Sequence, residues 1–380
     1  MNWPLFALAV GAFAIGTTEF MPMGLLPVIA HGLQVSVPTA GGLVTAYAVG
    51  VMVGAPIITL ALGRVRRKHA LIFLMGLYVA GNLLSAVANT YDLLLVSRVL
   101  TSLAHGAFFG LGAIEASLSV PAEKRASAVA SMFMGLTVAN IFGVPLATWL
   151  GTQLGWHMAF LATVALGLLT MIAVQTAIPN REAGTPPDAM SELKVLVRGN
   201  VVLALLTTAI GAGAMFVLYT YIAPILQHIT HASAAVITVA LMLTGVGFSI
   251  GNAIGGRSAD RSLDGSLLLF FPTLAIVMLA FPWMAQTVPG ALIGTLLFGA
   301  ATFALMPALQ MRVMQAAHEA PGLASSVNIG AFNMGNALGA ALGGIALSEG
   351  LGYAGVSIIG TGLAFLGVAL VLISRKVAPP

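Results

Sequence analysis

Very few ionisable side chains lie inside the long apolar stretches of this 380-residue sequence, and those few are its best candidates for chemistry. Of the eleven acidic residues, only Glu19 and Glu115 fall within such a stretch. Glu19 lies about 11 residues, or roughly 16 Å, from the outer end of its expected helix. A carboxyl group at that depth is withdrawn from water, which favours its neutral form and lets it exchange protons. Glu19 is therefore predicted to be a proton site; the alternative is a structural carboxyl that hydrogen-bonds a neighbouring helix.

A second group of polar side chains follows one face of the stretch 93–118. Arg98 is the only one of the fifteen lysines and arginines inside an apolar stretch, at a depth compatible with that of Glu19. Ser102 and His105 follow on the same helical face. The positive charge of Arg98 would favour the ionised form of Glu19. His105 could hold a proton or contact a ligand, and its alternative role is that of a packed hydrogen-bond donor.

Other charges lie near the ends of apolar stretches and could form ion pairs there. Glu115 could pair with an arginine of the loop after the second stretch, although a structural or incidental role is favoured by analogy with other boundary charges. In the second half, Asp260 lies beside two arginines and could form an equivalent pair. Such pairs would act as gates and not in chemistry. The charged residues considered for these gates are Arg64, Arg66, Arg67, Glu115, Arg257, Asp260 and Arg261.

The apolar stretches of the second half carry no charge, and their polar side chains are amides and phenols. Together with Tyr47 and Asn140 of the first half, these groups could exchange hydrogen bonds with a neutral ligand. Hydrogen bonding between helices explains any single one of them at least as well. Asn328 and Asn336 share a helical face, whereas Asn333 lies off it. The candidate ligand-binding residues are Tyr47, Asn140, Tyr219, Tyr221, Asn252, Asn328 and Asn336.

The composition defines the environment in which these side chains must work. Apolar residues make up 59% of the chain and charged residues 7%, and the mean hydropathy is +1.02. A soluble domain carries about 25% charged residues. No water-soluble fold could bury this much hydrocarbon, so we predict an integral membrane protein. The absence of cysteine excludes disulfides, thiolate metal sites and a cysteine nucleophile.

Twelve stretches have the length, about 20 residues, that a helix needs to cross a bilayer. A polar segment divides them six and six, which predicts an N-terminal six-helix bundle over 1–178, a cytoplasmic linker over 179–199 and a C-terminal six-helix bundle over 200–380. The first stretch lacks the basic start and cleavage pattern of a signal peptide and is expected to be retained. The expected spans are 4–30, 39–62, 70–88, 93–118, 126–150, 157–178, 200–226, 234–256, 266–285, 290–310, 323–347 and 354–374.

The basic residues predict the orientation of these helices. Fourteen of the fifteen lysines and arginines fall on one side of the expected bundle, and the loops of the opposite side contain none. By the positive-inside rule, that side, both termini and the linker are cytoplasmic. The net charge of +4 is thus a topology signal and requires no nucleic-acid partner.

The two halves are related by an internal repeat. Pairs of like residues recur at a nearly constant separation of about half the chain. Because six helices are an even number, both halves enter the membrane in the same orientation, and the repeat is a parallel duplication of the kind found in transporters. The pairs are Pro27 and Pro224, His31 and His228, Gly54 and Gly251, and Ala126 and Ala324.

Four segments carry a resemblance to a known family: 16–30 (GTTEFMPMGLLPVIA), 98–112 (RVLTSLAHGAFFGLG), 135–151 (GLTVANIFGVPLATWLG) and 325–344 (SSVNIGAFNMGNALGAALGG). They are similar to the major facilitator superfamily, in its twelve-span drug:proton antiporter branch, and to a bacterial inner-membrane group that includes arabinose-efflux-type permeases. The similarity extends over essentially the whole chain. It implies an all-α membrane protein of twelve transmembrane helices in two parallel-repeat six-helix bundles, a multi-pass location in the bacterial inner membrane, and a monomer.

Three motifs of that superfamily can be compared residue by residue. The loop after the second span has Gly63 in place of the usual acidic residue, whereas the equivalent loop after the eighth span retains Asp260. The fourth-span motif, an arginine followed by a glycine-rich helix, is met by Arg98. The fifth-span antiporter motif, usually G-P-x-x-G-G, is weakened here by an inserted valine, so its implication of antiport is only supportive. Its residues in this chain are Gly143, Pro145 and Thr148.

The resemblance and the deep acid together predict a proton-coupled secondary active transporter that exports a small organic molecule, a sugar or drug-like compound, by alternating access. A symporter or facilitator for a sugar or metabolite is the alternative on the same scaffold. The identity of the cargo is not determined by these residues, because the carboxyl could bind a cation, the arginine could bind an anion and the amides could bind a sugar. An enzyme is not expected, since the sequence has no metal-ligand spacing, no G-x-S-x-G elbow and no Walker motif. No cofactor is expected, and the partners are the cargo, protons and the lipid bilayer.

Overall fold

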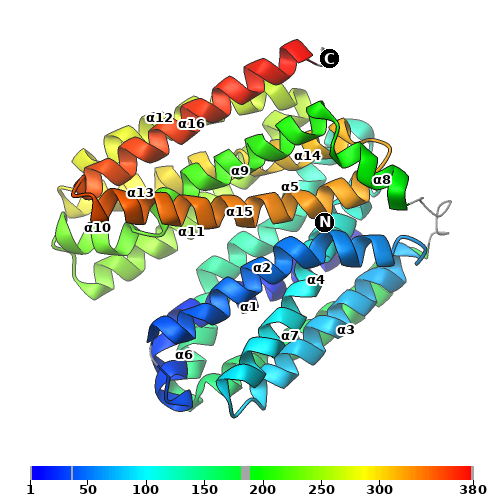
Figure 1. Cartoon of the computed structure of the whole chain (residues 1–380), viewed down its shortest axis with the longest axis horizontal. Helices are drawn as coiled ribbons and strands as arrows, with labels where there is room; N and C mark the ends of the chain where they lie inside the picture. The colour runs from blue at the N-terminus through cyan, green and yellow to red at the C-terminus, as the bar shows by residue number, and fades with distance from the viewer. Residues whose placement is uncertain (1, 36, 181–188, 378–380) are drawn as a thin grey trace. The chain divides into compact units, whose positions relative to one another are not determined.

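The computed structural model describes residues 2–35, 37–180 and 189–377, which form helices joined by short connections (Figure 1). These described ranges contain no strand. In a bilayer each unsatisfied backbone N–H or C=O group is costly, so an apolar chain of this kind adopts helices, whose hydrogen bonds are internal. The predicted all-α architecture is confirmed.

The first half contains α1 (Trp3–Leu33), α2 (Val37–Ala61), α3 (Arg67–Ala86), α4 (Tyr91–Leu118), the 3-10 turn η1 (Ala122–Lys124), α5 (Arg125–Val138), the π-helical turn η2 (Ala139–Gly143), α6 (Val144–Leu154), α7 (Trp156–Ala177) and α8 (Ala189–Leu196). The second half contains α9 (Gly199–Tyr219), α10 (Ile222–His228), α11 (Ala234–Arg261), α12 (Leu263–Met284), α13 (Val288–Phe303), α14 (Met306–Ala316), α15 (Pro321–Ser348) and α16 (Gly352–Val377).

Eleven segments are long and apolar enough to cross a membrane in the part of the chain that the structure describes. A further long helix, α15, has 28 residues and carries three asparagines, which make it more polar. Together these segments account for the twelve predicted spans. Three spans are interrupted, between α5 and α6, between α9 and α10, and between α13 and α14. Each interruption is followed within a few residues by a proline, Pro145, Pro224 or Pro307, which has no N–H to donate to the helical ladder.

The chain divides into two compact units, which we call unit 1 and unit 2. Unit 1 consists of Met1–Leu193 with Ala320–Gly330, and unit 2 consists of Lys194–Glu319 with Ala331–Pro380. The first turns of α15 therefore belong to unit 1 and the remainder to unit 2. The bundle boundaries at 178 and 200 stay a prediction, and residues 181–188 of the expected linker lie outside the described ranges.

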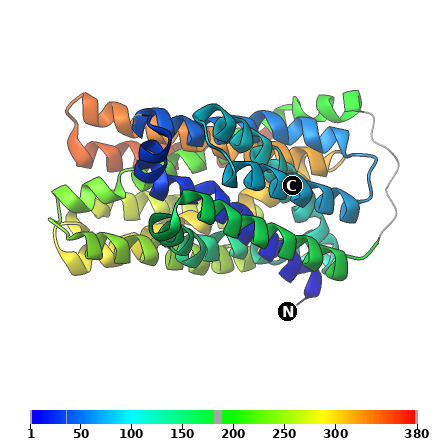
Figure 2. The ribbon, with the colours of Figure 1, turned by 90° about the horizontal axis from the view of Figure 1, so that it is seen from below.

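In unit 1, α4 packs against both α2 and α3, and α7 packs against both α3 and α1. The ribbon, seen from two sides in Figures 1 and 2, has these long helices side by side. Small residues permit the closest approach: a Cβ at Gly54 of α2 would lie 2.5 Å from the side chain of Leu103, and one at Gly106 of α4 would overlap Ala55. Helices in lipid associate through such close packing, because lipid tails are as apolar as the side chains.

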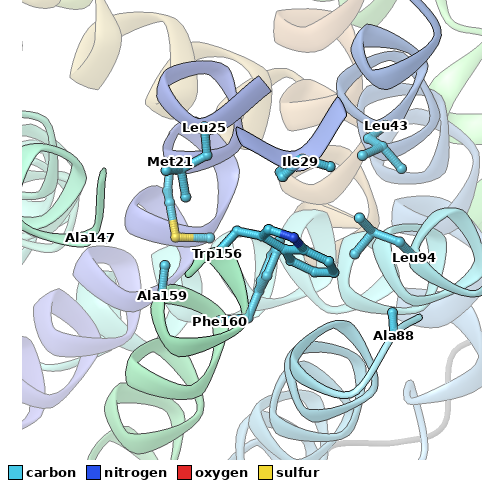
Figure 3. Packing of buried hydrophobic residues seen from close by; sticks show 10 residues of the cluster. All are labelled: Met21, Leu25, Ile29, Leu43, Ala88, Leu94, Ala147, Trp156, Ala159 and Phe160. Atoms are coloured by element: carbon cyan, nitrogen blue, oxygen red, sulfur yellow. The ribbon is translucent and has the colours of Figure 1, made fainter. Parts of the chain in front are cut away.

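An apolar cluster fills the space among α1, α2, α4 and α7 (Figure 3). Its aromatic members are Trp156 and Phe160 of α7, whose rings meet edge to face at 6.0 Å between centroids. The ring of Phe160 also lies 5.9 Å from the guanidinium carbon of Arg98, so the cluster borders the polar site described below. The cluster consists of Met21, Leu25, Ile29, Leu43, Ala88, Leu94, Ala147, Trp156, Ala159 and Phe160.

In unit 2, α11 packs against α13, while α16 packs against α9 and α12. Figure 1 shows α12 and α16 lying side by side. Glycines recur at every fourth position of α11, and a Cβ at Gly251 would overlap the backbone of Ala300 in α13. This spacing of small residues brings the two backbones into direct contact.

Candidate functional site

Four polar side chains from three helices meet inside unit 1, and we call them the Glu19 cluster: Glu19 of α1, Tyr47 of α2, and Arg98 and His105 of α4. Oε2 of Glu19 lies 4.0 Å from Nδ1 of His105. The hydroxyl of Tyr47 lies 3.2 Å from the same nitrogen. The guanidinium carbon of Arg98 lies 4.3 Å from the centre of the Tyr47 ring. The structure thus brings the three residues predicted for proton coupling together with one residue predicted for ligand binding.

The helices position this cluster through spacing and close packing. Arg98 and His105 are seven residues apart and share the face of α4 that Ser102 also occupies. Gly50 of α2 lies directly against Ser102, where a Cβ would overlap its hydroxyl group. Because Tyr47 stands one turn before Gly50, this close contact brings its ring over the same face of α4.

Arg98 is the most deeply buried charge of the cluster, with no exposed surface. Nη1 donates to the hydroxyl of Thr18 over 3.3 Å. Its planar cation also faces the rings of Tyr47 and Phe160, which provide cation–π attraction where water is excluded. Nε and Nη2 donate to no acceptor among the described residues. A buried guanidinium whose remaining N–H groups are unused can bind a carboxylate.

Glu19 is less enclosed, with 12% of its side chain exposed against 5% for His105. Among the described residues its close titratable neighbour is His105, and no ion pair joins it to Arg98. The sequence placed Glu19 and Arg98 at compatible depths but could not establish contact; in the structure they share neighbours without pairing. Their roles in coupling stay a prediction.

Sequence reasoning did not single out the neutral residues that surround Arg98. Thr18, Asn82 and Thr163 form a buried hydrogen-bonded group across α1, α3 and α7. The hydroxyl of Tyr78 donates to the backbone carbonyl of Ala14 over 2.8 Å. A usable signal existed, since Tyr78 and Asn82 are polar, four residues apart and on one face of an otherwise apolar helix.

The segment predicted as the antiporter motif contains the π-helical turn η2. Pro145 lies at the start of α6, and the missing N–H accounts for the widened turn before it. A Cβ at Gly143 would lie 3.0 Å from the ring of Phe13 in α1, so glycine permits close approach there. Thr148 lies against Gly24 in the same way. Nδ2 of Asn140 donates to the carbonyl of Leu136 over 3.0 Å, within its own helical segment.

The candidate gate of unit 1 contains an ion pair. Nη1 of Arg67, at the start of α3, lies 3.8 Å from Oε2 of Glu115, which is almost completely buried in α4. Arg64 and Arg66 lie in the turn before α3. The pairing of Glu115 with one of the three arginines was one of the sequence-based alternatives, and the gating function stays a prediction.

The helices of the second half run beyond the expected spans, and charged residues lie in these extensions. Arg312 lies in the candidate span Val288–Ala316, and its Nη1 is 2.9 Å from Oδ1 of Asp264 at the start of α12. Nε of Arg375 in α16 is 3.6 Å from Oδ2 of the same carboxylate. Three helices of unit 2 are thus joined at one carboxylate that sequence reasoning missed. The predicted gate residues Arg257, Asp260 and Arg261 all lie in the last turns of α11.

The residues predicted to bind a ligand have different environments. The ring of Tyr219 lies 5.6 Å from that of Phe248. The hydroxyl of Tyr221 donates to the carbonyl of Ala340 in α15 over 2.8 Å, which is the interhelical role left open for such groups. Asn252 and Asn328 are buried in unit 2 and unit 1 respectively. Oδ1 of Asn336, in unit 2, accepts no hydrogen bond from any described residue.

Comparison of the sequence with known proteins gives full-length matches. A profile described as the Major Facilitator Superfamily matches residues 8–329. The chain is 59% identical to the inner membrane transport protein YdhP of Escherichia coli, over 100% of this chain and 97% of that protein. It is 37% identical to a chloramphenicol resistance protein of Streptomyces lividans, over 89% of this chain and 88% of that protein. It is 30% identical to a probable sugar efflux transporter of Helicobacter pylori, over 92% and 90%.

Comparison of the fold gives the same result. The structure is similar to that of the Escherichia coli fucose:proton symporter, with a TM-score of 0.78 over 98% of this chain and 99% of that chain. The two sequences are 15% identical, so the likeness concerns the fold alone. These matches agree with the resemblance carried by the four sequence segments and confirm the predicted fold class.

Proposed function

The chain belongs to the major facilitator superfamily, and we propose that it is a proton-coupled exporter of a small organic molecule, with Glu19 as its proton site. Members of this family are transporters and not enzymes, and the 59%-identical relative is an inner membrane transport protein. The chain is accordingly a membrane transporter. Proton coupling, the direction of transport and the class of cargo are the proposed parts.

The observation that carries the proposal is the Glu19 cluster. An ionisable group in the membrane interior is costly and is retained for function more often than for structure. Burial favours the neutral form of the Glu19 carboxyl, whereas the cation of Arg98 nearby favours the ionised form. A carboxyl balanced between these two influences can take up a proton when it faces one side of the membrane and release it on the other.

Tyr47 supports a link between the proton and the cargo. Its hydroxyl meets His105, which also faces Glu19, and its ring faces Arg98. A cargo molecule that contacts Tyr47 would therefore disturb Arg98 and His105 directly, and Glu19 through His105. In an exporter of this type the cargo binds when Glu19 is ionised, and protonation of Glu19 expels it. Inward flow of protons then drives outward flow of cargo by alternating access.

Names of relatives support export and the cargo class. One relative is a chloramphenicol resistance protein and another is a probable sugar efflux transporter. On that basis we propose a sugar or drug-like cargo. The uncharged candidates Tyr219, Asn252, Asn328 and Asn336, together with Asn140, are proposed as its hydrogen-bonding partners. A symporter or facilitator for a sugar or metabolite is the alternative.

Charged pairs at the helix ends are proposed as gates. Arg67 with Glu115 would close unit 1, and Asp264 with Arg312 would act correspondingly in unit 2. Glu115 is almost completely buried whereas the side chain of Arg67 is 38% exposed, so separation of the pair would leave a buried carboxylate without this partner, and the pair favours the state in which it is formed. Arg257, Asp260 and Arg261 at the end of α11 are proposed to contribute on the same side.

The orientation and the assembly are also proposals. Fourteen of the fifteen basic residues occupy one side of the predicted topology, which places both termini in the cytoplasm. The bundles 1–178 and 200–380, joined by the linker 179–199, would then move against each other. The proton and cargo sites proposed here lie within one chain, which is consistent with a monomer.

The sign of a pH change tests the proposal. Purified protein is reconstituted into vesicles at equal pH on both sides, with a pH-sensitive dye in the lumen. Chloramphenicol, L-arabinose or ethidium is then added outside. An antiporter exchanges entering cargo for lumenal protons, so the lumen becomes alkaline. Acidification with cargo uptake would establish symport, and uptake without a pH change would establish a facilitator; either result would contradict the proposal.

A further inference from the structure

We infer that Asn82 of α3 is a positioning residue for Arg98, which it orients through the hydroxyl group of Thr18. The inference rests on the proposed role of Arg98 in proton coupling and extends that role to two neutral residues. Neither of them belongs to the Glu19 cluster.

Arg98, Thr18 and Asn82 form a continuous chain of hydrogen bonds. Nη1 of Arg98 donates to Oγ1 of Thr18 over 3.3 Å. The hydroxyl of Thr18 in turn donates to Oδ1 of Asn82 over 2.5 Å. All three side chains are fully buried. Because a buried polar group that loses its partner is destabilised, each member of the chain depends on the next.

The chemistry of the groups gives this chain a single direction. The guanidinium of Arg98 can only donate, so the oxygen of Thr18 must accept from it. A hydroxyl has one hydrogen, and Oδ1 of Asn82 is an acceptor in position to receive it. If the amide of Asn82 were reversed, its NH₂ group would face the hydroxyl, and the hydroxyl hydrogen would lose this acceptor. The orientation of Asn82 therefore decides whether the hydroxyl hydrogen of Thr18 is directed to Asn82 and away from the donors of Arg98.

Other contacts fix the orientation of Asn82. Its Nδ2 donates to the backbone carbonyl of Tyr78 over 2.9 Å, which only the NH₂ group can do. The hydroxyl of Thr163 in α7 lies 3.0 Å from Oδ1. The phenol of Tyr78 is itself bonded to the backbone of Ala14 in α1. Asn82 is thus oriented by its own helix, α3, while it acts on α1; Thr163 lies against it from α7, but its one hydroxyl hydrogen also reaches the carbonyl of Phe160 over 2.7 Å.

The consequence for Arg98 is a defined direction of its remaining donors. One nitrogen is held by Thr18, and one face lies over the ring of Tyr47. A planar guanidinium held at one atom and one face cannot turn freely. Nε and Nη2, which form one edge of the group, donate to no acceptor in the described structure. A carboxylate can accept from both atoms of that edge at once.

The titratable groups around Arg98 come from four helices. Glu19 of α1, Tyr47 of α2 and Tyr78 of α3 interact with it electrostatically, and His105 lies on its own helix, α4. Phe160, the neighbour from α7, is uncharged. Of these, Glu19 is the carboxylate that the directed edge of Arg98 would stabilise.

The experiment follows the protonation of Glu19 directly, without any cargo. Infrared difference spectra of the purified full-length protein are recorded across a pH titration, and the carbonyl band of protonated Glu19 is identified by its absence in Glu19→Gln. The variants are Thr18→Val and Asn82→Leu, which keep side-chain size and remove hydrogen bonds. Thr18→Ser retains the hydroxyl. Ser85→Ala is the matched control, because it removes a buried 2.7 Å hydrogen bond between α3 and α4, the helices of Asn82 and Arg98, that is not part of the Arg98–Thr18–Asn82 series of hydrogen bonds.

We expect Thr18→Val and Asn82→Leu to raise the pH midpoint of the Glu19 band by about 0.5 to 1 unit, because a less well directed cation stabilises the carboxylate less. The pH midpoint in the double variant should shift no further than in either single variant, since both changes break the same series of hydrogen bonds. Thr18→Ser and Ser85→Ala should titrate like the unmodified protein. If Thr18→Val does not fold, Asn82→Leu and Thr18→Ser still give the comparison.

Two failures can be told apart. If no band disappears in Glu19→Gln, or if the assigned band does not titrate, the proposed function is wrong. If the band titrates and its midpoint is the same in Thr18→Val, Asn82→Leu and Ser85→Ala, the positioning role is wrong and the proton site survives.

Discussion

Two substitutions of Tyr47 can distinguish the contributions of the two contacts that this residue makes within the Glu19 cluster. Its hydroxyl lies 3.2 Å from Nδ1 of His105, and its ring lies 4.3 Å from the guanidinium carbon of Arg98. Tyr47→Phe removes the first contact and keeps the second. Tyr47→Leu removes both, with a side chain that still fills much of the apolar space.

The magnitudes follow from the two kinds of contact. A neutral hydrogen bond contributes about 0.5–1.5 kcal/mol, so Tyr47→Phe should lower the rate of proton-driven transport by about two- to tenfold. A desolvated cation–π contact contributes about 2 kcal/mol, and Arg98 has no exposed surface. Tyr47→Leu should therefore lower the rate by a further factor of about thirty.

The assay is the initial rate of proton-driven cargo uptake into vesicles that contain equal amounts of correctly folded protein, as judged by size-exclusion chromatography. Tyr47→Phe should retain most of the pH profile at a reduced rate, whereas Tyr47→Leu should be nearly inactive. Equal loss in the two variants would show that the ring does not hold Arg98, and the reasoning from the cation–π contact would be refuted.

Three further predictions concern other parts of the chain. Arg98→Ala should move the pH optimum of transport upward, because loss of the nearby cation favours the neutral form of Glu19; an unchanged profile would mean that the two groups are uncoupled. Gly251→Leu should abolish the monodisperse peak in size-exclusion chromatography, since its side chain would enter the backbone of α13, whereas Gly362→Leu, where a Cβ meets open space, should behave normally. The hydrogen bonds from Arg198 hold the pKa of Glu319 below its ordinary value of 4.5, so this pair stabilises the fold above that pH and the effect is lost as the pH falls through the lowered value. Melting temperatures of Glu319→Gln and unmodified protein should therefore differ slightly at pH 7 and converge at low pH; a constant difference would contradict the assignment.

Helical periodicity was sufficient to predict part of the site. The seven-residue spacing of Arg98 and His105 requires that they share a face wherever α4 is helical, and the structure has them so. The depth of Glu19 in its helix follows from counting residues. Its closeness to His105, however, depends on how α1 packs on α4, and no single-helix pattern contains that information. Tyr47 was predicted for a ligand, and its contacts with the charged members were not foreseen for the same reason.

Two kinds of feature could not be predicted. Thr163 bonds to a carbonyl of its own helix, as Thr17 does, and nothing in the sequence distinguishes Thr18 from such threonines. The ion pairs of Asp264 were missed because hydropathy ends the spans early, whereas the helices continue to Arg312 and Arg375. Charged side chains lower the local hydropathy even where they extend a helix and pair at its end.

The central claim is that the carboxyl group of Glu19 carries the proton that drives transport. The most direct measurement compares Glu19→Gln with the unmodified protein and with Glu115→Gln, the other buried acid of the first half, in the same vesicles. Two quantities are recorded for each: cargo accumulation driven by a proton gradient, and exchange of labelled for unlabelled cargo without a gradient. We predict that Glu19→Gln loses accumulation and retains exchange, while Glu115→Gln, which weakens the proposed gate pair with Arg67, changes the rate of both processes but retains accumulation. Accumulation against a gradient in Glu19→Gln would contradict the account and place the proton site elsewhere, with His105 the next candidate.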